Sequence, residues 1–403
     1  MNLGGRVRLL ALAALLTAVG VGCSSTTVAG NPRPMAAPVD VAALKTGPHT
    51  PEPTAYDPDI DTVGDLRTLE ARRLLNYVVP SYRIDPEIDV PGTVQLFYDG
   101  KSMVSSETFP EKYESAAVAN NLLAGAYVSR INDNLRSRKK LIIAVLRFPT
   151  EAQSRTAAVQ FDQITNADPG RHPLSIDGHP NALTSSANDV TAITFLAHGP
   201  YMVVVNGGIP TADPAALTRL IGQTLSLQSA RLDQQQTPRL DDLLDIPLDP
   251  DGIMRRALPY SMDVSEPFML RTDFGAYQPS GQLHFERNPA AVQAAFDQGG
   301  VDLIARQSGI VYRARDLTSA FRLQSALLKM GKNDEDLGSP PGLPDARCVR
   351  LDLRDPIRNY DALCAVVFDR YVAVVTSRMP ALARIDQSLF QRAAAQYAIL
   401  ARS

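Results

Sequence analysis

The sequence predicts an α+β protein built from two duplicated halves, each an antiparallel sheet with helices in the ferredoxin-like manner, after a disordered N-terminal tether. Two observations predict this class. Apolar segments with strand and helix periodicity recur in the same order along both halves, and each half contains two strands separated by a tight turn. Such hairpins require antiparallel pairing, and the intervening helices can cover a face of the sheet. The length of 403 residues suits about two domains.

The N-terminal half is expected to span residues 62–233. Leucines at helical spacing predict a short first helix, and the run LIIAVLRF predicts a strand that leads into a second helix through Pro149-Thr150-Glu151. Two alternating apolar strands then flank the turn His198-Gly199-Pro200. The expected helix, strand, helix, hairpin and closing helix lie at residues 64–77, 141–148, 150–164, 190–206 and 213–232.

The C-terminal half is expected to span residues 268–403 and to repeat that order. A strand, a helix, a hairpin about Asp369-Arg370 and a closing helix are predicted at residues 310–315, 317–330, 362–376 and 381–401. Residues 234–267 are polar, rich in proline and acidic at several positions, so we expect them to link the halves.

Residue identities at a nearly constant spacing support a duplication. Thr150, Ala152 and Ala158 match Thr318, Ala320 and Ala326 at an offset of 168 residues, and Tyr201, Val204 and Val205 match Tyr371, Val374 and Val375 at 170. Upstream, Ala117, Val118 and Gly125 fall against Ala291, Val292 and Gly299. The period is too long for a solenoid repeat.

The N-terminus has the pattern of an export signal. Arg6 and Arg8 precede an uncharged run from Leu9 to Val21, which is too short to span a bilayer but suits a signal peptide over residues 1–22. Gly20-Val21-Gly22-Cys23 resembles a bacterial lipobox, which implies lipid attachment at Cys23 and cleavage before it. The position of Gly20 departs from that motif, where an aliphatic residue is usual, and an ordinary signal peptide is the alternative.

The segment that follows, residues 23–61, is rich in Ser, Thr, Ala and Pro and lacks an apolar period. We expect it to be a lipidated flexible tether that holds the folded body at the extracytoplasmic face of the cell membrane. The membrane, reached through this N-terminal lipid, is therefore one expected partner.

Two further cysteines remain, Cys348 and Cys364. An even number in an exported, oxidising setting favours a disulfide, and both lie in strand-like segments that could be neighbours in a sheet. A redox or metal role has less support, because no CxxC motif and no clustered histidine accompanies them.

Several C-terminal motifs resemble a family of actinobacterial, mycobacterial-type envelope lipoproteins of unknown function. They are Phe285-Glu286-Arg287-Asn288-Pro289, Gly299-Gly300-Val301-Asp302, Val311-Tyr312-Arg313-Ala314 with Asp316, and Tyr371-Val372-Ala373-Val374-Val375, together with both cysteines. The resemblance implies a secreted, lipidated, two-part protein with a C-terminal disulfide. It implies no catalytic residues, and the motifs look like fold determinants.

Local motifs for catalysis are absent from the sequence: it contains no GxSxG, HExxH, GxxxxGK[ST], GxGxxG or CxxC. His172, Asp177 and His179 could meet as zinc ligands, but their Pro- and Gly-rich surroundings favour a surface loop, and His198 suits a turn. The alternating acids from Asp57 to Asp61 lack the glycine and glutamate of a calcium loop. We expect no catalytic residue, metal or cofactor.

Charge and composition narrow the function. A net charge of −3 gives no electrostatic reason to bind nucleic acid, and the basic run at residues 136–140 suits a solvated helix end better than a headgroup site. We expect a non-catalytic envelope module that binds an apolar small molecule, a lipid or an envelope protein, with its site between the halves. The alternative is an envelope hydrolase acting on glycan, lipid or peptide.

Overall fold

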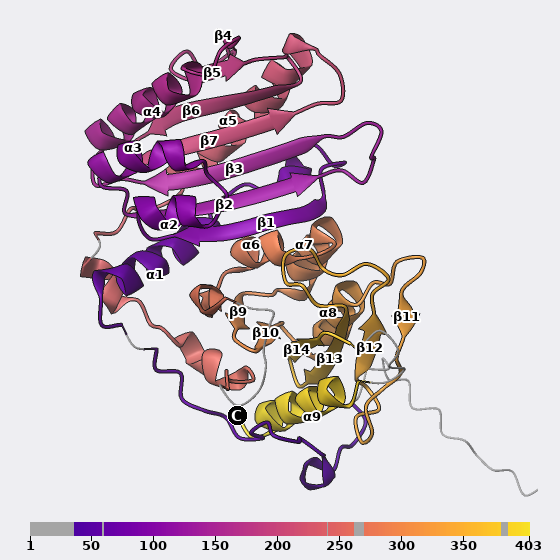
Figure 1. Cartoon of the computed structure of the whole chain (residues 1–403). Helices are drawn as coiled ribbons and strands as arrows, with labels where there is room; N and C mark the ends of the chain where they lie inside the picture. The colour runs from indigo at the N-terminus through magenta and orange to yellow at the C-terminus, as the bar shows by residue number, and fades with distance from the viewer. Residues whose placement is uncertain (1–35, 59, 240, 262–269, 380–385) are drawn as a thin grey trace, which may run out of the picture. The chain divides into compact units, whose positions relative to one another are not determined.

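The computed structural model describes residues 36–58, 60–239, 241–261, 270–379 and 386–403 (Figure 1). The predicted signal peptide, the predicted lipidation site Cys23 and the first part of the predicted tether lie outside the described residues. The α+β class with two antiparallel sheets is confirmed, although each sheet has seven strands, more than a ferredoxin-like unit contains.

The N-terminal sheet is antiparallel throughout. Its strands run in the order β1 (Val90–Phe97), β2 (Ala124–Ile131), β3 (Lys140–Arg147), β7 (Tyr201–Gly208), β6 (Thr191–His198), β5 (Leu183–Ser186) and β4 (His172–Pro173). The central strands β3 and β7 are buried along most of their length. Their nearly continuous apolar sequences therefore fit a sheet with both faces covered.

Helices pack on both faces of this sheet, whereas the sequence predicted helices on one face. Apolar residues of α1 (Val63–Leu75) and α5 (Pro214–Asp233) share one core cluster with β1, β2, β3 and β7. Those of α2 (Gly100–Ser105), α3 (Glu114–Ala119) and α4 (Glu151–Asn166) share another with the opposite face. Successive residues of a strand point to opposite faces, so a fully apolar strand needs helices on each side.

Side-chain caps fix where the long helices begin. Thr62 and Asp65 form a capping box at α1, Thr150 caps α4, and Asp213 caps α5 just before a proline at the first helical position. In the described part of the chain, no helix combines the length and the apolar character that crossing a bilayer demands.

The C-terminal sheet has the same topology. Its strands run in the order β8 (Gly275–Tyr277), β9 (Leu303–Arg306), β10 (Gly309–Arg313), β14 (Tyr371–Ser377), β13 (Ala362–Phe368), β12 (Arg347–Arg350) and β11 (Glu335–Asp336). Helices α7 (Pro289–Gly299) and α8 (Leu317–Leu327) pack on one face, and α9 (Gln387–Ala401) packs on the other. Short α6 (Pro279–Gln282) follows β8.

The duplication is visible in the strand order, but part of its register differs from the sequence alignment. Tyr201 and Tyr371 each begin the equivalent strands β7 and β14, as the offset of 170 requires. Helices α4 and α8 begin at Glu151 and Leu317, which are 166 residues apart rather than 168. Gly125 lies in a strand and Gly299 ends a helix, so that pairing is wrong. Small residues on helices match too easily by chance to fix a register.

Part of the predicted tether is packed against the C-terminal half (Figure 1). We call residues 36–58 the strap. Val39, Val41, Leu44 and Tyr56 are half-buried against the core cluster that contains α9, and the backbone amide of Ala37 donates to Asp345 over 2.6 Å. These few apolar side chains are enough to dock a segment whose composition alone suggests a free chain.

Part of the predicted linker is packed as well. It forms three short 3-10 helices, η4 (Asp241–Asp245), η5 (Pro250–Gly252) and η6 (Met254–Arg256). Ile253, Met254 and Leu258 are at most 1% exposed and belong to the core beneath α9. The apolar residues between the acids therefore contribute to a core rather than to a mobile connection.

Candidate functional site

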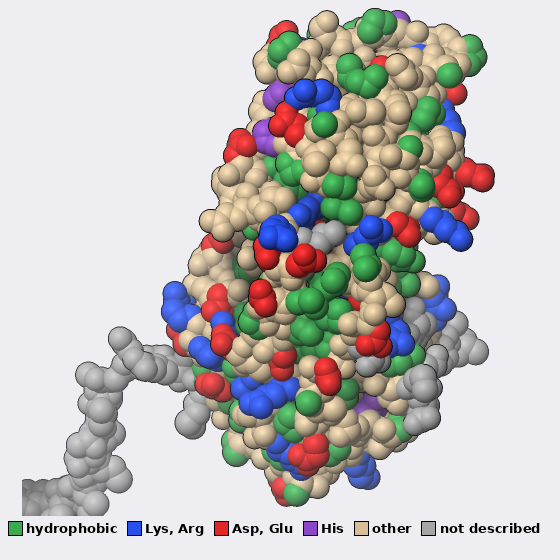
Figure 2. Space-filling model, turned by 90° about the vertical axis from the view of Figure 1, so that its left-hand side faces the viewer, with side chains coloured by type: hydrophobic (Ala, Val, Ile, Leu, Met, Phe, Trp, Pro, Cys, Tyr) green, Lys and Arg blue, Asp and Glu red, His purple; other side chains and the backbone are tan. Residues whose placement is uncertain are grey.

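A cleft lies where α1 of the N-terminal half meets η4, η5 and the β8–β9 edge of the C-terminal half. Its volume is about 340 Å³. Figure 2 views the side on which α1 and η4 lie, and hydrophobic side chains gather near the middle of that face. The apolar lining consists of Leu69, Tyr77, Leu243, Ile246, Pro247, Leu248, Pro250, Ala276, Tyr277 and Leu303.

The polar lining consists of Arg72, Arg73, Asn76 and Gln278. Arg73 already has a partner, because its guanidinium donates to the fully buried carboxylate of Glu70 over 2.7 and 2.9 Å. Glu70 also pairs with Arg147 over 2.6 Å. A pocket with an apolar wall and a few placed polar groups is the usual form of a small-molecule site.

Arg72 differs from its neighbour. Within the described residues, no carboxylate forms a hydrogen bond or ion pair with it, and its buried Nε atom has no partner. The nearby carboxyl of Asp273 is buried, and burial raises its pKa to about 6, while the charges of Arg306 and Arg72 act to lower it. Burial likewise raises the pKa of Tyr56, which Arg72 opposes.

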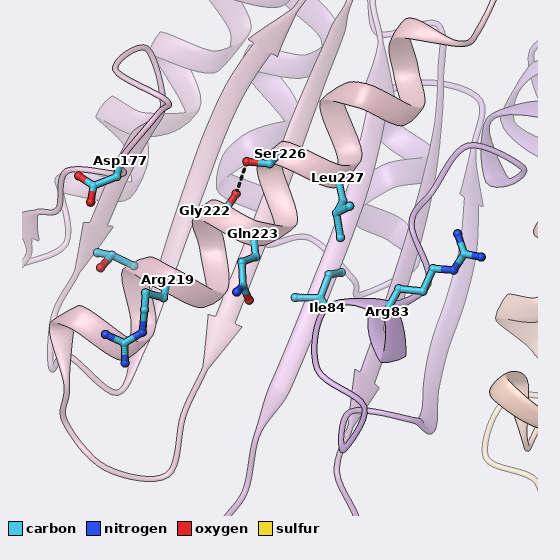
Figure 3. A pocket seen from close by; sticks show the side chains of 9 residues that line it. Arg83, Ile84, Asp177, Arg219, Gly222, Gln223, Ser226 and Leu227 are labelled. Atoms are coloured by element: carbon cyan, nitrogen blue, oxygen red, sulfur yellow. Dashed lines mark hydrogen bonds between the residues drawn. The ribbon is translucent and has the colours of Figure 1, made fainter.

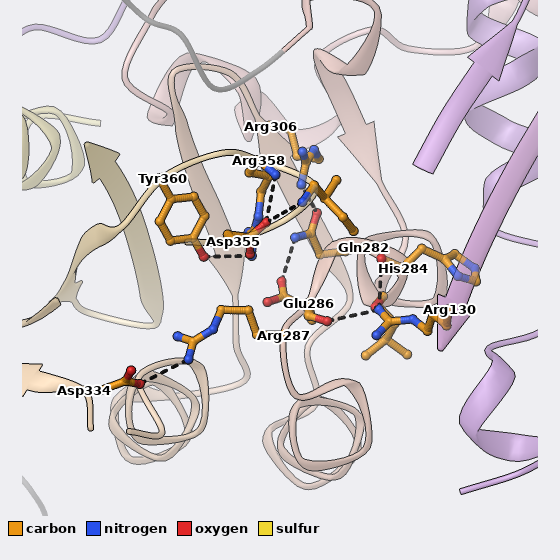
Figure 4. Close-up of polar contacts among 12 residues, drawn as sticks. Arg130, Gln282, His284, Glu286, Arg287, Arg306, Asp334, Asp355, Arg358 and Tyr360 are labelled. Carbon is orange, nitrogen blue, oxygen red and sulfur yellow. Dashed lines mark hydrogen bonds and ion pairs between the residues drawn. The ribbon is translucent and has the colours of Figure 1, made fainter. Parts of the chain in front are cut away.

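A buried polar network lies behind the cleft in the C-terminal half (Figure 4). Tyr312 and Gln282 both donate to Glu286, each over 2.6 Å, and Arg306 donates to Gln282 over 3.0 Å. The Arg306 guanidinium also lies 3.7 Å from the ring centre of Phe285. Burial and the Glu286 charge raise the pKa of Tyr312 well above its usual value, so its hydroxyl stays a donor.

The C-terminal sequence motifs have structural roles, in this network and at the ends of helices. Glu286 and Tyr312 come from two of them and meet in the core. Pro289 begins α7, Gly300 ends it in the left-handed conformation, and Asp316 caps α8. These residues therefore determine the fold, and none of them faces an open pocket large enough for a substrate. The small cavity beside Glu286 and Tyr360 has a volume of about 10 Å³, room for about one water molecule.

The predicted disulfide partners are joined in the structure. Cys348 and Cys364 are directly opposite each other on β12 and β13, with their α-carbons 4.0 Å apart and both side chains fully buried. They pack in the core beneath α9. The bond therefore ties an outer strand of the sheet to its centre.

The four polar residues considered for catalysis or zinc binding do not converge. His172 pairs with Asp189 over 2.9 Å, His198 with Asp233 over 2.7 Å, and His179 with Ser226 over 2.9 Å. No hydrogen bond joins any two of His172, Asp177, His179 and His198, although all four lie in described segments. Across the residues that the structure describes, no cluster of three His, Cys, Asp or Glu side chains could hold a metal ion.

The His179 and Ser226 pair lies near an open groove along α5. The groove has a volume of about 580 Å³, and Figure 3 shows Ile84 and Leu227 facing each other across it. The Ser226 hydroxyl donates to the Gly222 carbonyl over 2.9 Å, so it accepts from His179 instead of giving it a proton. This is the reverse of the arrangement that activates a serine nucleophile.

The basic run at residues 136–140 is largely occupied by intramolecular contacts. Lys139 pairs with Asp85 over 2.8 Å and with Glu87 over 2.9 Å. Arg138 donates to the Asn132 carbonyl over 2.7 Å. The run lies in the connection between β2 and β3, not at a helix end as expected.

Two adjacent family matches cover the two halves of the chain. Residues 57–248 match the N-terminal part, and residues 253–403 the C-terminal part, of a family described as a domain of unknown function, DUF7373. The chain belongs to the DUF7373 family. No curated protein sequence matches this DUF7373 chain.

One solved structure is similar to part of the DUF7373 chain. It is the extracellular domain of PknH from Mycobacterium tuberculosis, at 11% sequence identity and a TM-score of 0.29. The match covers 41% of this chain and 97% of that one.

Sequence reasoning missed the residues that form the cleft of this DUF7373 protein. Arg72 and Arg73 were part of a generic amphipathic helix, and Leu243, Ile246 and Leu248 lay in a presumed linker. One usable signal was the set of leucines and isoleucines among the acids of that linker, which is unusual for a solvated chain.

Proposed function

We propose that this protein is an exported, lipid-anchored binding protein of the cell envelope, which holds an apolar small molecule in the cleft between its halves and carries out no chemistry on it. One observation carries the proposal: a cleft of about 340 Å³ with a mainly apolar lining at the junction of the halves. Ligand sites form preferentially at such junctions.

Features of the chain outside the cleft support export and anchoring. The leader before Cys23 has the charge, length and small residues of a lipoprotein signal, and the buried bond between Cys348 and Cys364 suits an oxidising compartment. Expression of the native chain and of Cys23→Ala, with mass spectrometry of the mature N-terminus, tests the anchor. The native chain should carry an acyl mass at Cys23, and an unmodified N-terminus contradicts the anchor.

A cavity-filling variant tests binding. We expect the full chain to bind the neutral apolar dye N-phenyl-1-naphthylamine with a rise in fluorescence, and Ala276→Phe to reduce its affinity at least about tenfold by occupying the cleft. Leu244→Phe is the matched control, since Leu244 is 61% exposed on η4 and does not line the cleft.

The outcomes separate binding from catalysis. Equal dye affinity in Ala276→Phe and the native chain contradicts the proposed cleft. Turnover of an envelope glycan, lipid or peptide by the native chain contradicts the non-catalytic assignment. Circular dichroism confirms that both variants fold.

A further inference from the structure

The residues that line the cleft include two arginines, Arg72 and Arg73, and no acid. The buried carboxylate of Glu70 faces two guanidinium groups, those of Arg73 and Arg147. The buried carboxyl of Asp273 likewise lies in the field of two, those of Arg72 and Arg306. Buried charges are costly unless paired, so an excess of cations beside an apolar wall favours an anionic ligand group.

Arg72 is the lining cation best placed to meet that group. Arg73 has a carboxylate partner, whereas Arg72 has none within the described residues. Tyr56 forms a side-chain hydrogen bond with Arg72, but the Nε atom of Arg72 is buried without one. The acids of η4 are exposed, so water screens their field at the cleft. The half-buried Asp249, between the lining residues Leu248 and Pro250, accepts a hydrogen bond from the backbone amide of Met254.

The backbone beside Arg72 is shaped to admit its side chain. Gly275 in β8 has a φ of +152°, and a β-carbon there would overlap the Arg72 guanidinium. Only glycine gives this close approach without strain. The guanidinium is therefore held against β8 of the C-terminal half, beside a lining that is mainly apolar.

We infer that the cleft binds an amphiphile with a single acidic head group, which pairs with Arg72 while its hydrocarbon part lies along Leu69, Leu243 and Leu303. This inference rests on the proposed function. A carboxylate and a phosphate share the required chemistry, since a guanidinium donates to either through two N–H groups.

Displacement of the bound dye tests the inference on the full chain carrying Cys23→Ala. Laurate should displace N-phenyl-1-naphthylamine at a concentration about tenfold lower than dodecan-1-ol, because a charge-assisted hydrogen bond contributes about that factor. Arg72→Gln should remove this preference, with dye affinity measured for each variant so that displacement is compared at equal dye occupancy, and Arg72→Lys should keep part of it. Arg136→Gln, at an exposed loop position outside the cleft, is the matched control and should keep all of it.

The results distinguish this inference from the proposed function. If the dye binds in the cleft but laurate and dodecanol displace it equally, or if Arg72→Gln keeps the preference, the acidic head group is wrong while the apolar site stands. If the dye does not bind, the proposed function fails first. Lauroyl lysophosphatidic acid tests a phosphate head group at the same chain length as laurate. Whichever of the two anions displaces the dye at the lower concentration identifies the head group.

Discussion

Replacing Arg130 should uncouple the two halves of the protein. Arg130 lies in β2 of the N-terminal half and is 1% exposed. Its guanidinium donates to the carbonyl groups of Leu283, His284 and Glu286 over 3.2, 2.9 and 3.0 Å, and it also donates to the carbonyl of Asp89 (Figure 4). Three of its four acceptors therefore belong to the other half.

The expected loss follows from those contacts. Burial lowers the pKa of Arg130 to about 10, which leaves it charged at neutral pH, although nearby Asp89 and Glu286 act to raise the pKa. In Arg130→Met the alkyl packing remains, but buried carbonyl groups lose their donor, at about 1–3 kcal/mol for each unsatisfied group. Relief from burying the charge offsets part of this cost, so we expect a net loss of about 3–5 kcal/mol.

Urea unfolding followed by far-ultraviolet circular dichroism measures this loss, because the chain has no tryptophan. Arg130→Met should shift the transition to lower urea and separate it into two steps as the halves lose their coupling. Arg136→Met, at an exposed position of the connection that follows β2, should stay within about 0.5 kcal/mol of the native chain. A single transition within about 1 kcal/mol of native stability in Arg130→Met refutes the reasoning.

Three further predictions concern the strap, the disulfide and the cleft. Burial lowers the pKa of His49 to about 4, and the Arg392 charge acts the same way. The contribution of neutral His49 to docking of the strap is therefore fully present above about pH 6.5 and is lost by about 1 kcal/mol per pH unit as the pH falls towards 4. His49→Gln, but not His172→Gln, should flatten the pH dependence of proteolysis in the strap. Cys348→Ala with Cys364→Ala should lower stability by about 3 kcal/mol, read by thermal unfolding, and accessible thiols in the unreduced native chain contradict the bond. Gly275→Ala should displace Arg72 and weaken laurate binding at least about tenfold. Unchanged affinity contradicts the role of the close approach between Gly275 and Arg72.

The elements that the sequence predicted best are those with local signals. The hairpin about His198-Gly199-Pro200 appears as β6 and β7, and the one about Asp369-Arg370 as β13 and β14. Turn residues and alternating strands are adjacent in sequence, so periodicity finds them. The strands β1 and β2 were missed, since β1 contains a proline and a glycine and is stabilised by pairing with residues 28 to 41 positions later in the chain.

The other features that the sequence did not predict depend on contacts between distant segments. The packing of the strap depends on α9 and Asp345, about three hundred residues later in the chain. The cleft depends on α1 meeting η4 and β8, which no local pattern encodes. The disulfide was within reach of the sequence because cysteine number and strand-like flanks constrain it strongly.

The duplicated sheets carry an arginine at the same position, but its ion pairs differ between the two halves. Arg147 pairs with Tyr201 across β3 and β7 just as Arg313 pairs with Tyr371 across β10 and β14, so the two arginines occupy equivalent positions. Arg313 forms ion pairs with the exposed acids Asp302 and Asp251, whereas Arg147 is 5% exposed.

Arg147 differs from Arg313 in that its acidic partner is buried. This partner is the fully buried Glu70 of α1, which also binds Arg73 at the cleft. Because Arg147 and Arg73 share this single carboxylate, the N-terminal copy of the duplicated arginine supplies buried positive charge at the junction of the halves. The C-terminal copy is neutralised by two acids at the surface. The asymmetry therefore lies in which acids the helices and loops bring to a shared sheet position, and it places a buried carboxylate shared by two arginines beside the cleft that we propose as the binding site.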